Sequence, residues 1–134
     1  MATYSLHVLS VDCNIQDAKI LELIIKSQHH YVDRVTSSED ALKCMYKKKY
    51  NLLFYSSNPK DTNTIDFIKT VRQLDSDISI IPIYPKVKES ESEQEAKDTE
   101  AQARDAGALD VIRKPYTVDI IKHCLVLLWT LLGF

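Results

Sequence analysis

Short apolar runs alternate five times with segments of helical period along the 134 residues of this chain. This alternation is typical of strand and helix units arranged around a parallel sheet. We expect strands at Leu6 to Val11, about Tyr31 to Thr36, Asn51 to Tyr55 and Ser79 to Ile83, and a short fifth strand just before Lys114. The sequence therefore predicts an α/β fold with helices on both faces of the sheet.

Length and composition limit the chain to one domain, expected over residues 1–134. The formal net charge of −2 does not indicate the basic surface that nucleic-acid binding requires. The N-terminal sequence lacks the features of a signal peptide and no apolar run is long enough to span a bilayer, so we expect a cytoplasmic protein with no membrane partner. Cys13, Cys44 and Cys124 are scattered without CxxC spacing, which predicts reduced thiols and no zinc site.

Capping signals predict where the first helices begin. Asn14 with Asp17 three residues later predicts an N-cap, and Ser37 with Asp40 predicts another. The periodicity of the first helix predicts that it buries Ile20, Leu21, Ile24 and Ile25 against the sheet.

Two segments in the second half depart from regular patterning. Pro82 lies within the fourth strand and cannot donate a backbone hydrogen bond, so we expect that strand to be distorted or partly unpaired on one side. Residues 86–99 are charged and have no apolar face. We expect a solvated, mobile insertion or a frayed helix start before the fourth helix, and a tolerated surface insertion is favoured over a recognition insert.

The residues at the ends of the strands are candidates for a functional site, because ligands of open parallel sheets bind beyond the carboxyl ends of the strands. These residues are Asp12, Cys13, Ser56, Tyr84 and Lys114.

Two motifs give the chain a resemblance to a known family. HVLSVDCN (His7 to Asn14) places an acid at the end of an apolar strand, and ARDAGALDVIRKPYT (Ala103 to Thr117) ends a helix and leads through a strand to Lys114-Pro115. Over essentially its whole length the chain resembles the receiver domains of response regulators. The resemblance implies one flavodoxin-like (βα)5 domain, a five-stranded parallel sheet of order 2-1-3-4-5, and a cis peptide bond at Lys114-Pro115.

The chain departs from the family at the positions that carry its chemistry. Where the family has a second acid, an acceptor aspartate, a threonine or serine and a switch aromatic, this sequence has Cys13, Ser56, Tyr84 and Val111. A serine hydroxyl is a much poorer nucleophile than a carboxylate, and Asp12 alone is a weak magnesium site. We therefore expect a degenerate pocket without catalysis, cofactor or metal, in which Lys114 pairs with Asp12 and hydrogen-bonds the Oγ of Ser56.

Asp61, Cys13 and the pocket itself leave other chemistries open. Asp61, in the loop after Ser56, could act as a substitute acceptor, but its position five residues later is poorly suited to that role. Cys13 could be a redox thiol near a lysine, although a small residue filling the place of a lost acid is favoured. The pocket could also bind a small anion or an unidentified metabolite.

The last helix, Val118 to Leu132, has more apolar residues than one sheet-facing stripe can bury. We expect part of it to be exposed as an interaction surface, on the face that the family forms from helix four, strand five and helix five. Interface candidates are Ile121, Leu125, Leu128 and Trp129, and a homodimer through this helix is one expected arrangement.

The sequence leaves two functional hypotheses. The first is a receiver-like signalling module, not an enzyme, that acts by protein–protein interaction without phosphorylation; its partners would be other signalling proteins, including a histidine kinase or phosphotransfer protein that transfers no phosphoryl group. The alternative is a flavodoxin-like protein that binds FMN or a small anion through the loop after Ser56. Phosphate loops favour glycine, and the only glycines are Gly107 and Gly133.

Overall fold

A five-stranded parallel sheet forms the centre of the molecule in the computed structural model, which describes residues 5–133. The strands are β1 (His7–Val11), β2 (Tyr31–Val35), β3 (Leu52–Ser56), β4 (Ser79–Tyr84) and β5 (Ile112–Arg113). Their order is β2-β1-β3-β4-β5, which confirms the predicted topology. All five carboxyl ends therefore lie along one edge of the sheet.

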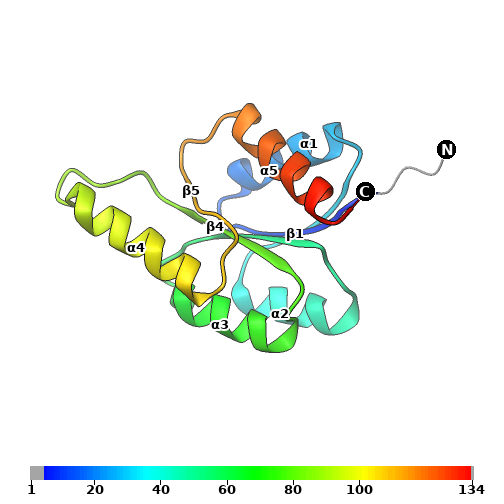
Figure 1. Ribbon diagram of the computed structural model, residues 1–134, viewed down its shortest axis with the longest axis horizontal. Coiled ribbons are helices and arrows are strands. Elements are labelled where there is room, and N and C mark those ends of the chain that lie inside the picture. Colours follow the sequence, from blue (N-terminus) through cyan, green and yellow to red (C-terminus); the bar gives the residue numbers. More distant parts are fainter. Residues whose placement is uncertain (1–4, 134) are drawn as a thin grey trace.

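Five helices cover the two faces of the sheet (Figure 1). One face carries α1 (Ile15–Ser27) and α5 (Val118–Leu131), and the other carries α2 (Ser38–Lys47), α3 (Thr64–Leu74) and α4 (Glu93–Ala106). The predicted N-caps are confirmed, because the side chain of Asn14 accepts a hydrogen bond from Asp17 N and that of Ser37 accepts one from Asp40 N. In the described part of the chain, no helix has both the length and the apolar character needed to cross a membrane.

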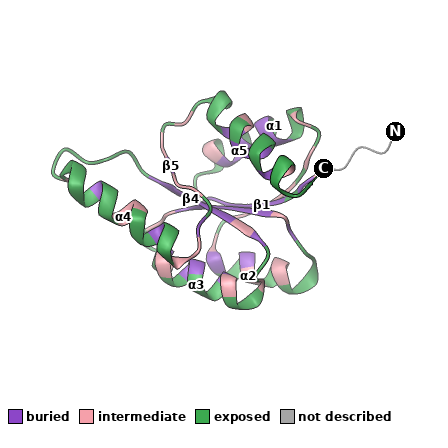
Figure 2. Cartoon of the chain, viewed as in Figure 1, coloured by how far each residue is buried: buried purple, intermediate pink, exposed green. Residues whose placement is uncertain are grey.

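The sheet divides the buried side chains into two cores. Successive residues of a strand point to opposite faces, so Leu52 and Phe54 of β3 belong to the core under α1 and α5, whereas Leu53 and Tyr55 belong to the core above α2, α3 and α4. Every residue of β3 is buried, as expected for the central strand of a parallel sheet covered on both faces (Figure 2).

One expectation about the helices is wrong. Ile20 is 52% exposed, and the buried residues of α1 are Ala18, Leu21, Ile24 and Ile25. Of the two alternatives for residues 86–99, a helix start fits residues 93–99, because Ser92 caps α4 and the helix begins at Glu93. A helix with few apolar residues can form here because only Ala96 and Ala103 need to be buried.

Pro82 sits in an unbroken register with Tyr55 of β3. The backbone oxygens of Ile80 and Tyr84 accept hydrogen bonds from Leu109 and Lys114 on the β5 side. Pro82 lies between them with the same orientation, so its missing donor faces β5, where β4 pairs through only two residues. The Lys114-Pro115 peptide bond is cis, as the resemblance implied.

His30 joins the start of β2 to the start of β1. Its Nδ1 accepts a hydrogen bond from the backbone N–H of Leu6 at 3.0 Å. Burial of the imidazole, with the neighbouring His29, lowers the pKa of His30. Protonation would convert Nδ1 from an acceptor to a donor and remove this bond.

We predict that the free energy of unfolding decreases as the pH falls from 7.5 to 5.5, because the folded state takes up a proton at His30 less readily than the unfolded state. The stabilising contribution is complete above the pKa of the unfolded histidine and is lost as the pH falls through the lower folded pKa. Urea unfolding at several pH values should show a smaller decrease for His30→Gln. The matched control is His123→Gln, which removes an exposed histidine without touching this bond; equal pH dependence of wild type and His30→Gln would contradict the prediction.

Candidate functional site

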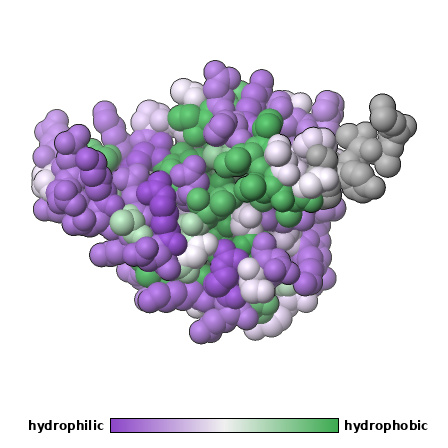
Figure 3. Space-filling model, in the orientation of Figure 1, coloured by the Kyte–Doolittle hydropathy of each residue, from purple (hydrophilic) through white to green (hydrophobic). Residues whose placement is uncertain are grey.

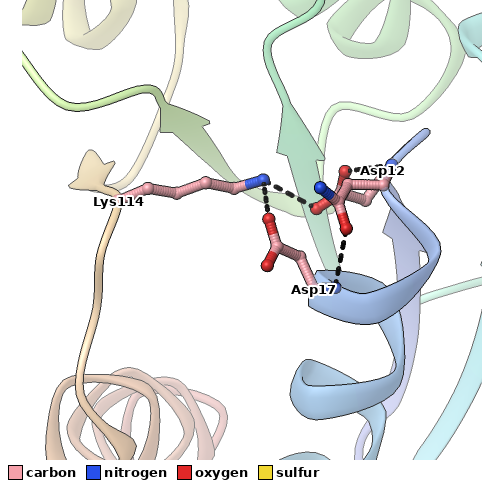
Figure 4. Close-up of polar contacts among 4 residues, drawn as sticks. Asp12, Asp17 and Lys114 are labelled. Atoms are coloured by element: carbon pink, nitrogen blue, oxygen red, sulfur yellow. Dashed lines mark hydrogen bonds and ion pairs between the residues drawn. The ribbon is translucent and has the colours of Figure 1, made fainter.

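A closed ion-pair cluster occupies the carboxyl edge of the sheet (Figure 4). Lys114 follows β5 and extends to two carboxylates, with its Nζ 3.1 Å from Oδ2 of Asp12 and 2.7 Å from Oδ2 of Asp17. Asp12 directly follows β1, and its other oxygen accepts a hydrogen bond from Asn14 N at 2.9 Å. The single ammonium thus joins the first strand and the first helix to the last strand.

The ion-pair cluster is largely shielded from solvent. The carboxylate of Asp12 is 4% exposed. A buried carboxylate is costly unless it is paired with a cation and hydrogen-bonded. Burial of the Lys114 ammonium opposes its charged form, but the hydrogen bonds and attraction from Asp17 and Asp12 outweigh it and raise the pKa of Lys114. The cation is therefore retained at neutral pH.

The sequence predicted the contact between Lys114 and Asp12 but missed Asp17. The second and shorter bond of Lys114 goes to Asp17. Among the described residues, its hydrogen bonds go to these two carboxylates and none goes to Ser56, so that part of the prediction is wrong. The available signal was the position of Asp17 in the first turn of the helix that begins at the Asp12 end of β1.

Ser56 and Cys13 flank the cluster without joining it. Ser56 is the buried last residue of β3, and its alternation with Leu52 and Phe54 assigns it to the same face of the sheet as Asp12 and Lys114. Cys13 is an exposed free thiol. The strand ends thus supply one buried carboxylate from β1 and a neutral hydroxyl from β3.

Tyr84 and Val111 lie on the opposite face, in the core under α3 and α4. The ring of Tyr84 is stacked by the guanidinium of Arg113 at 5.2 Å, and burial raises the pKa of the Tyr84 phenol despite the nearby cation. The expectation that Tyr84 shares one pocket with Lys114 is therefore wrong. The sequence missed Arg113, which alternation places on this face with Val111.

Asp61 is bound by a second set of hydrogen bonds. Its carboxylate accepts from Ser38 N at 2.8 Å, Ser38 Oγ at 2.5 Å and Thr62 N at 2.7 Å. Burial of this carboxyl opposes ionisation, but the Ser38 and Thr62 bonds lower the pKa of Asp61. These bonds attach the β3–α3 loop to the first turn of α2. The carboxylate of Asp61 is engaged in them, so it is not free to act as a substitute phosphoryl acceptor.

The polar cavity of about 540 Å³ beside this loop is lined by the hydroxyl and amide residues that suggested phosphate binding. Asp61 lines it as well and adds a negative charge, which opposes an anion. In the described part of the chain, no group of three or more His, Cys, Asp or Glu residues is arranged to hold a metal ion.

Three of the four interface candidates are buried, which corrects the prediction. Ile121, Leu125 and Leu128 pack in the core between α5 and the sheet, and Trp129 is partly buried against the same core. The prediction that part of the helix remains exposed is confirmed, but by other residues: Val118, Ile120, Val126, Leu127, Leu131 and Leu132.

Neither a protein-family model nor a curated protein matches the chain. Solved structures do match it. A two-component response regulator from Clostridium difficile has a TM-score of 0.80 at 17% identity, covering 94% of this chain and 97% of that one. An orphan response regulator of H. pylori has a TM-score of 0.77 at 22% identity, with 92% and 97% covered.

The chemotaxis response regulator CheY4 of Vibrio cholerae has a TM-score of 0.78 at 16% identity, with 93% of this chain and 99% of that chain covered. Together with the strand order, these similarities show that the chain has the flavodoxin-like fold of response-regulator receiver domains.

We predict that Lys114→Met lowers the free energy of unfolding by about 2–4 kcal/mol, because it leaves the buried Asp12 without its cation; partial exposure of Lys114 keeps the cost below the upper range. A double-mutant cycle with Asp12→Asn, measured by urea unfolding, should give a double variant less destabilised than the sum of the single variants. Lys86→Met is the matched control, since this exposed lysine lines the neighbouring cavity and forms no ion pair there. Additive costs would contradict the coupling.

A second prediction concerns Asp61. Asp61→Ala should destabilise the fold by about 1–3 kcal/mol, because Ser38 N and Thr62 N lose their acceptor. Amide hydrogen exchange should rise in residues 57–63 and in the first turn of α2 while the centre of β3 stays protected. Asp66→Ala, an exposed acid in the first turn of α3, is the matched control. Unchanged exchange in both segments would show that the loop does not depend on Asp61.

Proposed function

We propose that this protein is a receiver-like signalling module that acts by protein–protein interaction, independently of phosphorylation and without enzymatic activity. The observation that supports this most strongly is the ion-pair cluster, in which the Lys114 ammonium is already bound by Asp12 and Asp17. An incoming phosphoryl group would have to displace a carboxylate to reach that cation.

The charge at the strand ends supports the same proposal. Phosphoryl transfer needs an anionic acceptor and a magnesium ion to neutralise the transferring group. Ser56 provides a neutral hydroxyl and Cys13 a thiol where oxygen ligands would be required. With Asp17 committed to Lys114, the oxygen ligands left for a hard cation are too few.

The second support is the arrangement around Tyr84. Tyr84 is buried and stacked by Arg113, and the backbone oxygen of Pro85 accepts a hydrogen bond from Arg113 Nη1 at 3.0 Å. These contacts hold the start of the β4–α4 connection against β5. We therefore propose that the surface formed by α4, β5 and α5 is presented in one conformation, ready to bind signalling partners such as a histidine kinase or phosphotransfer protein.

The hydropathy of the surface supports this location (Figure 3). Hydrophobic side chains gather over α5 and extend toward the β5 edge, beside the hydrophilic surface of α4. The exposed apolar residues of α5 include Ile120, Leu127 and Leu131. An apolar patch of this kind on a small protein usually marks an interaction surface.

The test uses ¹⁵N-labelled protein with magnesium and either acetyl phosphate or beryllofluoride. We expect no cluster of shifted amide resonances at Asp12, Ser56 or Lys114, and no change in mass. A conventional receiver domain controls for the reagents. The matched variant combines Cys13→Asp with Ser56→Asp, which restores acids at the strand ends and should respond to the mimic. A magnesium-dependent response of the wild type would contradict the proposal.

A further inference from the structure

The cavity that carries this inference lies between the β3–α3 loop and α4. Its volume of about 540 Å³ is within the range of about 300–1,000 Å³ that is typical of small-molecule sites. Nine of its eleven lining residues carry a hydroxyl, amide or carboxylate group, and the other two are Pro59 and Ile65. None of these lining residues belongs to the cluster of Asp12, Asp17 and Lys114, so within the described part of the chain the two sites are separate.

The loop side of the cavity supplies amide groups as hydrogen-bond donors. The Oδ1 of Asn58 accepts a hydrogen bond from Lys60 N at 3.0 Å, and the Oδ1 of Asn63 accepts one from Ile65 N at 2.9 Å. These backbone bonds hold each side-chain amide by its oxygen and leave its NH2 group, which can donate two bonds. Among the described residues, no acceptor is bonded to either NH2 group, so both are available to a ligand.

The α4 side of the cavity supplies acceptors. Thr99 donates its hydroxyl proton to the backbone oxygen of Glu95 at 3.0 Å, which leaves the lone pairs of its Oγ1 for a ligand. Gln102 lies three residues further along α4 and is exposed. Its side chain has no hydrogen-bond partner among the residues that the structure describes, so its carbonyl and its NH2 group can both be used. Donors and acceptors therefore line the cavity from two different elements.

The charge of the cavity disfavours ionic ligands. Its lining includes Asp61 and, within the described residues, no lysine, arginine or histidine, so an anion would be repelled without a compensating cation. A cation would need the oxygens of Asp61, but these already accept three hydrogen bonds from Ser38 and Thr62. A carboxylate has about four lone-pair sites, so little acceptor capacity remains. A neutral ligand is therefore favoured.

The mixed lining matches a ligand with many hydroxyl groups. Each hydroxyl of a sugar or sugar alcohol is both a donor and an acceptor, as the lining requires. A flat ring such as a flavin or a nucleobase would instead need an apolar slot. Pro59 and Ile65 supply little apolar surface, and the guanidinium of Arg113 already lies over the ring of Tyr84.

We propose that the cavity between the β3–α3 loop and α4 binds a neutral polyhydroxylated small molecule, a sugar or a sugar alcohol. The amides of Asn58 and Asn63 donate to its hydroxyl oxygens, and Thr99 and Gln102 accept its hydroxyl protons. Because these groups come from the loop and from α4, the bound polyol joins the two elements. Only two alanines of α4 are buried, so such a contact adds to the few that hold this helix. The inference adds a ligand site to the proposed function and does not depend on it.

The test titrates ¹⁵N-labelled protein with glucose, ribose, sorbitol and inositol, each to about 30 mM, because a site with little apolar surface is expected to bind in the millimolar range. We expect saturable amide shifts from at least one of these compounds, confined to residues 57–65, Thr99, Gln102 and their neighbours. The same compound should slow amide hydrogen exchange in the β3–α3 loop and in α4. The absence of saturable shifts with all four compounds, or shifts centred on another part of the molecule, would overturn the proposal.

Charged relatives of the same compounds test the preference for a neutral ligand. Gluconate adds a carboxylate to the sorbitol frame, and we expect it to bind at least about threefold more weakly because Asp61 repels it. Glucosamine adds an ammonium to glucose and should bind no more tightly than glucose, since the oxygens of Asp61 are occupied. Tighter binding of either charged compound than of its neutral parent would show that the site recognises charge, and the proposal would fail. Adenosine that binds more tightly than ribose would assign the affinity to the base and contradict the proposal as well.

Variants of the protein locate the contacts. Gln102→Ala should weaken binding by about threefold or more, whereas Gln94→Ala, which changes an exposed glutamine of the same helix outside the cavity, should leave it within about twofold. Asn63→Asp keeps the cap of α3 but replaces the NH2 donor by an acceptor, so it should weaken binding by a similar factor. Asn14→Asp, the same change at the cap of α1, is its matched control. Unchanged affinity in both Gln102→Ala and Asn63→Asp would show that the polyol does not use this cavity.

Discussion

The ammonium of Lys114 is the interaction on which the arrangement of this site depends. It binds Asp17 and Asp12, which lie 97 and 102 positions before Lys114 in the sequence. The ammonium therefore connects the first βα unit directly to the last. Asp12 is buried, and a buried carboxylate left without a cationic partner is strongly destabilising. Because Asp17 supplies a second carboxylate, the positive charge is balanced within the protein.

The parts of the structure that the sequence predicted are those set by local chemistry. Alternation of apolar runs identified all five strands, and the caps at Asn14 and Ser37 were identified because an N-cap bond spans only three residues. Ile20 was assigned wrongly because helical period alone does not locate the edge of the buried stripe; Ala18, a smaller residue, takes the buried place instead. Loop and helix start stayed open for residues 86–99 because the segment has no apolar face, and only two buried alanines seat α4.

The errors at the site have a different cause, since they concern competition between distant groups. Position in the resembled family assigned Ser56 as the second partner of Lys114, but a charged carboxylate is a stronger acceptor for an ammonium than a hydroxyl, and Asp17 was within reach. Tyr84 was grouped with Lys114 because both end a strand. Side-chain alternation places them on opposite faces, and only the register of β4 with β5 makes that plain.

The two faces of the sheet are closed by separate sets of contacts. The ion-pair cluster belongs to the α1 and α5 side of the sheet, whereas Tyr84 and Arg113 belong to the α3 and α4 side. Here each face is closed by its own contacts, the first by two carboxylates around one ammonium and the second by an aromatic ring under a guanidinium. A cavity of about 430 Å³ between β5 and α5 is lined by both Ile112 and Val111, which belong to the two different cores, so β5 is the strand at which the two sets of contacts meet.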